Sequence, residues 1–331
     1  MADLFKGMPR SFEATQQISY QNAYKRKYED KSIMDLITNS DFKGKFYKKG
    51  TTIRLPIQPK VMIRETQPGG GIIYQKPKDT HEDFTIGREY YWALEFMPED
   101  TAFAPWDPKS PIVNDAAREM AEHIETQFGA DIINKCNKYN TGNHAGARSE
   151  GFDLGDVASG SQVFLYETTA ARNEDTTHAH KAVAPDFIVH CINCIKEQKG
   201  AKGQDFFAVI PTIVADKIQT SELKLAGLYE ERNSLLREDV AALGKLGGAT
   251  VIQDDTMLPI FKDATKNDCN VYPILFGSKK AITFADEVVF RDSSMKDISS
   301  WDEFHRCKTV CDWFVLYPEF FGVAYVSLAS K

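Results

Sequence analysis

The side chains best able to support chemistry in this sequence are cysteines and histidines, and two cysteines stand at a spacing used by metal and redox sites. Cys191 and Cys194 form a CxxC pair within HCINC, and a structural zinc site of this type requires a second pair of ligands. The nearest second pair, Cys307 and Cys311 with His305 close by, lies far along the chain. Because CINC falls inside an apolar helical stripe, we interpret its cysteines as small core side chains.

A second candidate for metal binding is His178-Ala179-His180, which could present two imidazoles from a strand. The polar residues before it and the helical pattern soon after indicate a loop that leads into that helix instead. A cytoplasmic metal-dependent enzyme that uses His178, His180, Cys191 and Cys194 stays an alternative. We expect no catalytic residues, no metal and no cofactor.

The glycines Gly244, Gly247 and Gly248 do not form a phosphate-binding loop. They end a weak helical pattern and precede a strand. A phosphate loop has the reverse order, from strand through glycines to helix, with a lysine and a hydroxyl inside it. The sequence contains no GxSxG, HExxH or dinucleotide fingerprint. It therefore offers little support for an enzyme.

Composition excludes several classes of protein. The 331 residues are 42% hydrophobic and 11% aromatic, which is ordinary for a folded protein and excludes disorder throughout. The net charge of −7 argues against a broadly basic nucleic-acid binder. The chain has no apolar stretch long enough to cross a bilayer and no signal-peptide core. We therefore expect reduced cysteines in a soluble cytoplasmic protein with no membrane partner.

The elements that would position a functional surface begin with a long hairpin. Ile53, Leu55 and Ile57 alternate with other residues before TQPGGGIIYQKP, and a second alternating stretch, FTIGREYYWALEF, follows it. Alternation with period two predicts strands with one buried face, and PGGG predicts a turn that needs positive φ angles. Residues 61–78 contain too few large apolar side chains for a core of their own. The hairpin must therefore pack against something else.

The strongest element is an amphipathic helix over residues 111–139. Ser110 and Pro111 suit a cap and a first turn, Gly142 suits a stop, and Gly129 should weaken or bend the helix. Its apolar stripe, at spacings of three and four, consists of Val113, Ala117, Met120, Ile124, Phe128, Ile132, Cys136 and Tyr139. Its acidic residues are expected to face solvent: Asp115, Glu119, Glu122 and Glu125.

The rest of the chain mixes helices and strands. One helical turn after Ser32 should lie along another part of the molecule. Beyond the long helix, the patterns predict a strand at 163–166, a helix at APDFIVHCINCIKEQKG, and a strand followed by a helix at DFFAVIPTIVADKI. Further strands are predicted in ATVIQDDTMLPIF, VYPILFGSKKAITFADEVVF and CDWFVLYPEFFGVAYVSLASK. This interrupted order is typical of the α+β class.

This order of elements resembles that of the major capsid (coat) proteins of tailed bacteriophages, which have the Hong Kong 97 fold. KGTTIRLPIQPKVMIRE and YQKPKDTHEDFTIGREYYWALEF are similar to the opening and return strands of an extended loop, and residues 111–139 to a spine helix. GKLGGATVIQDDTMLPIF, with its Leu258-Pro259 pair, is similar to part of an axial domain, and FVLYPEFFGVAYV to the closing strands. The resemblance covers nearly the whole chain but includes no single diagnostic motif.

The resemblance implies five regions. They are an N-terminal arm at residues 1–45, the extended-loop hairpin with its return strand at 46–97, a peripheral domain with the spine helix at 98–180, an axial domain at 181–272, and return strands at 273–331 that complete the peripheral domain.

It also implies a structural function: self-assembly into pentamers and hexamers of an icosahedral head that encloses double-stranded DNA. Contacts between subunits are implied at the loop tip, at Thr66, Pro68, Gly69, Gly70, Gly71, Tyr74 and Lys76. The region near the axis of each pentamer or hexamer is implied to contain Leu246, Gly247, Gly248, Asp254 and Asp255.

Besides other copies of the chain, the implied partners are a separate scaffolding protein, a portal protein, a decoration protein in some cases, and packaged DNA contacted without sequence specificity. A fused scaffolding segment is not expected, because the hairpin begins near residue 50. Some members crosslink an extended-loop lysine; Lys60, Lys76 and Lys78 lie in that region, but we expect no crosslink. The implied location is the virion, after assembly in the host cytoplasm. An encapsulin-like compartment with a protein cargo is the main alternative.

Overall fold

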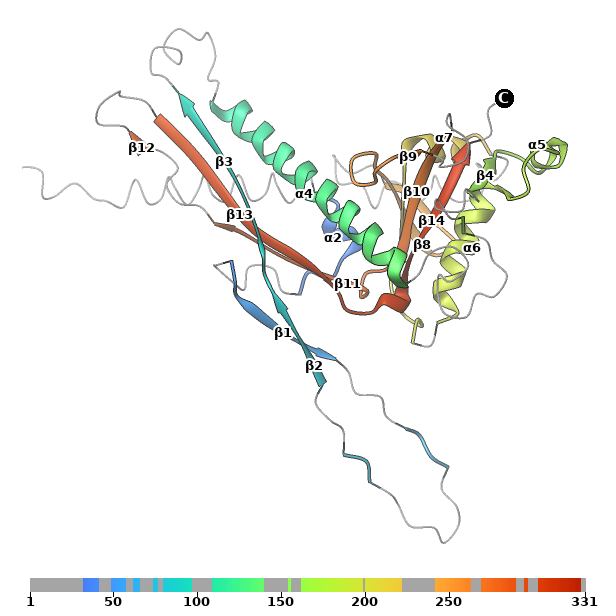
Figure 1. Cartoon of the computed structure of the whole chain (residues 1–331), viewed down its shortest axis with the longest axis horizontal. Helices are drawn as coiled ribbons and strands as arrows, with labels where there is room; N and C mark the ends of the chain where they lie inside the picture. Colours follow the sequence, from blue (N-terminus) through green and yellow to red (C-terminus); the bar gives the residue numbers. More distant parts are fainter. Residues whose placement is uncertain are drawn as a thin grey trace, which may run out of the picture.

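The protein, described here by a computed structural model, consists of a body built on a large sheet, an elongated body built on a smaller sheet, and a projecting hairpin (Figure 1). The structure describes residues 32–41, 49–57, 62–65, 74–76, 80–96, 109–139, 154–155, 162–198, 200–221, 242–262, 269–289, 295–296 and 303–328. Among these residues, no helix combines the length and apolar character needed to span a bilayer.

An eight-stranded mixed sheet forms the larger body. Its strands follow the order β5-β4-β14-β10-β6-β8-β7, and the short strand β9 pairs with β10. Their bounds are β4 Val163–Tyr166, β5 Lys181–Val183, β6 Phe206–Ile210, β7 Ala242–Leu246, β8 Ala249–Gln253, β9 Phe261–Lys262, β10 Asn270–Ser278 and β14 Phe321–Leu328. Strand β6 has the sequence FFAVI and is buried at every position. Such a continuous apolar run is expected for a central strand that is covered on both faces.

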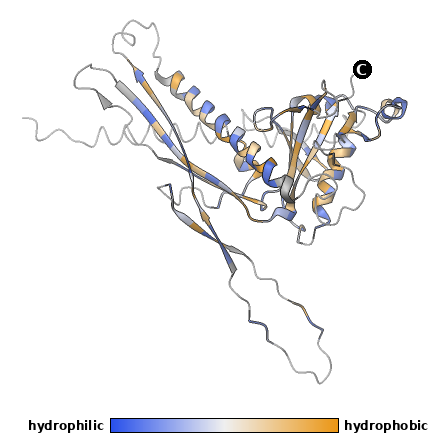
Figure 2. Cartoon of the chain, viewed as in Figure 1, coloured by the Kyte–Doolittle hydropathy of each residue, from blue (hydrophilic) through white to orange (hydrophobic). Residues whose placement is uncertain are grey.

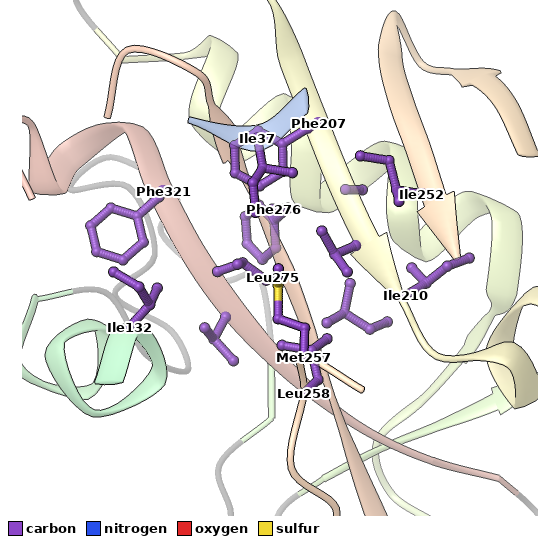
Figure 3. Packing of buried hydrophobic residues seen from close by; sticks show 14 of the residues in the cluster. Ile37, Ile132, Phe207, Ile210, Ile252, Met257, Leu258, Leu275, Phe276 and Phe321 are labelled. Atoms are coloured by element: carbon purple, nitrogen blue, oxygen red, sulfur yellow. The ribbon is translucent and has the colours of Figure 1, made fainter. Parts of the chain in front are cut away.

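Helices α6 (Ala184–Lys196) and α7 (Thr212–Gln219) pack on this sheet. The apolar stripe predicted around CINC is confirmed, since Cys191 and Cys194 are buried, together with Phe187 and Ile195 of the same helix. Figure 3 shows part of the main core, in which sheet residues such as Ile210, Ile252, Leu275 and Phe276 are joined by Ile132, Met257 and Ile37 from outside the sheet.

The smaller sheet supports the long helix. It contains β3 (Arg88–Phe96), β11 (Ile282–Val289), β12 (Met295–Lys296) and β13 (Glu303–Val315). Strand β13 is central and pairs antiparallel with both β3 and β11. Helix α4 (Lys109–Tyr139) runs alongside this sheet (Figure 1). Ring contacts join the two layers, with centroids 5.5 Å apart for Phe128 and Trp313 and 5.1 Å apart for Tyr90 and His123.

The predicted helix over 111–139 is confirmed, and so is the described part of its apolar stripe. Ala117, Met120, Ile124, Phe128 and Ile132 are buried. The side chains of Val113, Cys136 and Tyr139, and all of Gly142, lie outside the described residues.

The interpretation of Gly129 as a weak point is incomplete, because this glycine is a packing site. A Cβ at Gly129 would overlap the carbonyl oxygen of Met257 and would lie 2.8 Å from the carbonyl carbon of the same residue. The absence of a side chain therefore lets the loop after β8 lie directly on the helix backbone.

The projecting hairpin consists of β1 (Thr52–Ile57) and β2 (Thr80–Thr85), which pair antiparallel. A hairpin was predicted here, but its second arm lies earlier than expected, since most of FTIGREYYWALEF forms β3 and pairs with β13. Its base does have a core. Leu55, Phe84 and Ile86 form a small separate cluster with Ala285 of β11 and Val310 of β13. The hairpin is thus anchored to the smaller sheet, while its distal part extends away from both bodies (Figure 1).

Three short helices complete the described elements: α2 Met34–Ile37, α5 Thr169–Glu174 and the 3₁₀ helix η3 Pro318–Phe320. Helix α2 is the turn predicted after Ser32. Ile33, Met34 and Ile37 are buried in the main core. The expectation that this segment lies along another part of the molecule is therefore confirmed.

The prediction of a helix that ends in glycines is wrong over its last residues. Residues 242–246 form strand β7, which pairs antiparallel with β8. Gly247 and Gly248 form the two-residue turn between these strands, with φ angles of 60° and 79°. Two positive φ angles are what a tight hairpin turn requires. The glycines thus mark a hairpin, and residues 222–241 lie outside the described part.

The eight-stranded sheet takes strands from several of the five implied regions. Strand β4, from region 98–180, and strand β14, from region 273–331, both belong to the eight-stranded sheet. Strand β14 lies between β4 and β10, so the end of the chain returns to the larger body instead of joining β11 and β13. Figure 2 shows that hydrophobic residues are dense in this body, whereas α4 and β13 are coloured in alternating patches.

Candidate inter-subunit contact surfaces

The two arms of the projecting hairpin are held together mainly by polar contacts. Arg54 and Asp83 form an ion pair of 3.0 Å across β1 and β2, and the hydroxyl oxygens of Thr52 and Thr85 are 3.0 Å apart. Beyond the strands, the amide side chain of Gln75 pairs with the backbone of Met62. It accepts from the Met62 N–H at 3.1 Å and donates to the Met62 carbonyl oxygen at 2.8 Å. The arms therefore stay side by side well past β1 and β2.

This distal part exposes large apolar side chains. Ile63 is 98% exposed, Tyr74 87% and Met62 66%. Single exposed apolar residues are common on protein surfaces, but here three lie within two short adjacent segments that extend away from both bodies (Figure 1). We call residues 62–65 and 74–76 the distal loop segments.

Of the residues implied at the loop tip, two are described. Tyr74 and Lys76 are exposed on the second distal loop segment. Thr66, Pro68, Gly69, Gly70 and Gly71 lie outside the described residues, as do Lys60 and Lys78. Ile63 and Met62, which the sequence analysis did not single out, are described and exposed beside Tyr74. The available signal was the short apolar run VMI between charged residues in KVMIRE.

The β7–β8 turn, which the resemblance implies near the symmetry axis, packs against α6. The ammonium group of Lys196 donates a hydrogen bond to the Gly247 carbonyl oxygen, and it also lies over the ring of Phe206 at 5.5 Å. A Cβ at Gly247 would lie 3.3 Å from Val189. The tip of the β7–β8 hairpin is therefore fixed on the end of a helix, with Leu246 half-buried beside it.

The two aspartates implied in the same region have distinct local contacts. Asp255 accepts from the backbone N–H of Thr212 at 2.8 Å and from its hydroxyl group, and so stabilises the first turn of α7. Asp254 uses Oδ1 to accept from both the N–H and the hydroxyl of Thr256, each at 2.8 Å. Its Oδ2 is buried and has no hydrogen-bond partner within the described part of the chain.

The acidic residues of α4 do not all face solvent, contrary to the prediction. Asp115 and Glu119 are exposed and, with Glu122, surround the guanidinium of Arg118. Glu125 is only 4% exposed, and its Oε1 accepts from the N–H of Ile33 at 2.7 Å. Helical spacing alone did not separate Glu125 from its neighbours, because the segment that covers it comes from the N-terminal region.

Strand β3 presents aromatic side chains in two directions. Tyr90, Trp92 and Leu94 line a groove of about 510 Å³ between β3 and α4, together with Met120. On the opposite side of the strand, Tyr91 is exposed. The alternation in REYYWALEF is thus confirmed as that of a strand, and one face of this strand lies beneath the helix.

The residues proposed for metal binding do not converge on a site. Cys191 and Cys194 are buried in the core, and burial raises the pKa of the Cys191 thiol, which disfavours the thiolate that a metal binds. In the described part of the chain, no group of three or more His, Cys, Asp and Glu residues could hold a metal ion. The interpretation of CINC as core is confirmed.

His178 lies in a local polar cluster instead. Its Nδ1 is 2.7 Å from a carboxylate oxygen of Asp175, and its ring stacks on Phe164. Hydrogen bonds from Thr177 and Tyr166 hold the pKa of Asp175 well below its usual range. This cluster orders the turn before β5, and His180 is exposed.

Comparison with solved structures identifies the fold. A structure of Mycobacterium phage Che8 aligns with a TM-score of 0.50 at 13% identity, covering 88% of this chain and 90% of that chain. The capsid of Ralstonia phage GP4 aligns with a TM-score of 0.54 at 10% identity, covering 89% and 87% of the two chains. No protein-family model matches the sequence, and neither does any curated protein. The chain has the Hong Kong 97 fold, as its order of elements predicted.

Proposed function

We propose that this chain is the major capsid protein of a tailed bacteriophage. It would assemble into pentamers and hexamers of an icosahedral head that encloses double-stranded DNA. The observation that carries the proposal is a fold shared, over nearly the full length of both chains, with the capsid of Ralstonia phage GP4. Sequence identity is low, so the proposal rests on architecture and on what the described surfaces can do.

The distal loop segments support assembly because they expose apolar surface that the described part of the chain does not cover. Burial of a large apolar side chain contributes about 1.5–3 kcal/mol. Ile63 and Tyr74, both almost fully exposed, would provide this stabilisation when they lie on a neighbouring subunit. In a closed shell every subunit gives and receives such a contact, so modest energies add over many copies.

The remaining contacts are assigned by the same proposal. The loop tip, with Gly69, Gly70 and Gly71, would contact a neighbour. The β7–β8 turn at Gly247 and Gly248 would lie near the axis of each pentamer or hexamer. Lys196 fixes this turn on α6. A contact surface that is repeated in many copies must keep one shape, and this bond helps the turn to do so.

The chain would act as a structural protein without enzymatic activity. Its partners would be other copies of itself, a separate scaffolding protein, a portal protein and, in some particles, a decoration protein, with DNA in the interior. It would reside in the virion after assembly in the host cytoplasm. The five regions implied by the sequence remain our proposed domain division, with β4 and β14 contributing strands to the larger sheet.

Expression of the full chain with and without the product of a neighbouring scaffolding gene tests this function. We expect fast-sedimenting closed shells, visible by negative-stain electron microscopy, in at least one of the two conditions. Small discrete oligomers in both conditions would contradict the proposal. Shells that enclose a co-purifying protein instead of nucleic acid, in infected or native cells, would favour the encapsulin-like alternative.

A further inference from the structure

The N-terminal segment at residues 32–39 is attached to the rest of the molecule at two points. At one end, the N–H of Asn39 donates to the Ile282 carbonyl oxygen at 2.9 Å, and the N–H of Phe284 donates to the Asn39 carbonyl oxygen at 3.0 Å. These bonds add the segment to the edge of β11. At the other end, the N–H of Ile33 donates to Glu125 of α4 at 2.7 Å.

Glu125 is unusual because its carboxyl group is buried under this segment. Burial is the main cause that raises its pKa to about 8, and the negative charges of Asp254 and Glu122 act in the same direction. The hydrogen bonds donated by the Ile33 N–H and the Ser32 hydroxyl oppose the shift. At neutral pH the side chain is therefore mostly protonated and carries an O–H group to donate.

Asp254 adds a negative charge to the surroundings of Glu125. It lies in the loop that follows β8, the loop whose residue Met257 rests on Gly129 one turn further along α4. Its Oδ1 is occupied by Thr256, whereas its Oδ2 is buried and has no partner among the described residues. A proton on Glu125 would remove the repulsion between the two groups.

We propose that Glu125, which is buried under residues 32–39 and accepts the hydrogen bond from the Ile33 N–H, is a pH-dependent latch for this segment. The latch joins two parts that are distant in sequence, the N-terminal segment and α4. Release of the segment would expose Glu125 to water and return its affinity for the proton to that of an ordinary glutamic acid.

The sign of the pH effect follows from this difference. The docked state holds a proton that the released state loses, so docking is strongest at low pH and weakens as pH rises. The change takes place between the ordinary value of 4.5 and the docked value of about 8. Within that window the docking equilibrium should fall by up to about tenfold per pH unit, and above it the equilibrium should level off.

Hydrogen exchange of the purified full-length chain, followed by mass spectrometry between pH 6 and 9, tests the latch. Exchange times are scaled at each pH for the intrinsic base-catalysed rate, so that protection factors can be compared. Peptides covering residues 33–38 should lose protection by about tenfold per pH unit up to about pH 8. Peptides covering β6 (Phe206–Ile210) should show no such trend.

Three variants separate the latch from a general loosening of the fold. Glu125→Gln keeps the acceptor for Ile33 but cannot ionise, so protection should stay high and independent of pH. Asp254→Asn removes one negative charge and so lowers the pKa of docked Glu125; the loss of protection should therefore level off at a lower pH than in the wild type and be smaller in total. Glu119→Gln, on the exposed face of the same helix, should behave as the wild type.

The proposal is overturned if the wild-type segment shows equal protection at pH 6 and pH 9. It is also overturned if Glu125→Gln retains the wild-type pH profile. Should Glu125→Gln fail to fold, the Asp254→Asn profile decides, and a profile identical to that of the wild type contradicts the latch. None of these outcomes depends on whether the chain forms shells.

Discussion

At the scale of single residues, Gly129 shows how one missing side chain fixes the relation between two bodies. The backbone of Met257 lies where a Cβ would stand, and the Met257 Cγ would be only 2.9 Å from it. Thr126, one turn earlier, donates to the Thr256 carbonyl oxygen at 3.1 Å. The loop after β8 is thus seated directly on α4.

Replacement Gly129→Ala should therefore destabilise the subunit although alanine favours helices. The gain in helix propensity is about 1 kcal/mol. Because the neighbour at Gly129 is backbone that cannot rotate away, the cost of overpacking should exceed this gain and leave a net loss of about 1–3 kcal/mol. Urea unfolding of the two proteins measures the difference. Gly87→Ala is the matched control, since its Cβ would make an ordinary contact of 3.5 Å with Asp312. Equal stability of Gly129→Ala and wild type would contradict this account.

Several single-residue roles could not be predicted, for a physical reason that they share. Glu125 and Gly129 take their roles from segments that are distant in sequence, residues 32–39 and the loop after β8. No local pattern on the helix reveals which part of its polar face another segment will cover. By contrast, the burial of Cys191 and Cys194 was predicted from their place in an apolar stripe, because that stripe is local.

At the scale of elements, the hairpin combines an anchored base with an apolar distal part. Leu55, Phe84 and Ile86 fix the base on the smaller sheet. The distal loop segments are held to each other by Gln75 and expose Ile63 and Tyr74. An element built in this way keeps its orientation while its apolar end reaches beyond the subunit.

The double variant Ile63→Ser/Tyr74→Ser should separate folding from assembly. Both side chains are exposed in the subunit, so the free energy of unfolding should change by less than about 0.5 kcal/mol. Because the variant buries less apolar surface between subunits, the concentration needed for assembly should rise by at least about tenfold. Thermal unfolding and sedimentation velocity measure the two quantities. Glu82→Ser, an exposed change on the hairpin base, should alter neither. Normal assembly of the double variant would exclude the distal loop segments as a contact.

Elements with a strong local period were predicted well, and elements defined by pairing were not. The long helix and the α6 face followed from spacing alone. Strand β7 was mistaken for the end of a helix because LGKLGG has no alternation of its own. It becomes a strand through pairing with β8 across the Gly247-Gly248 turn. The position of β14 between β4 and β10 likewise depends on pairing that no local pattern encodes.

At the scale of the whole molecule, the described part of the chain is extended in two directions, along α4 and along the hairpin (Figure 1). A monomer of this shape leaves much surface open, whereas a shell subunit uses such extensions to overlap its neighbours. The fold shared with the capsid of Ralstonia phage GP4 supports the second interpretation.

Electron cryomicroscopy of particles formed by the full-length chain tests the central claim most directly. The proposed function predicts a closed shell in which the subunits form fivefold and sixfold rings, with Ile63 and Tyr74 of each subunit buried on a neighbour. A discrete small oligomer, or a particle in which the distal loop segments remain in solvent, would contradict it.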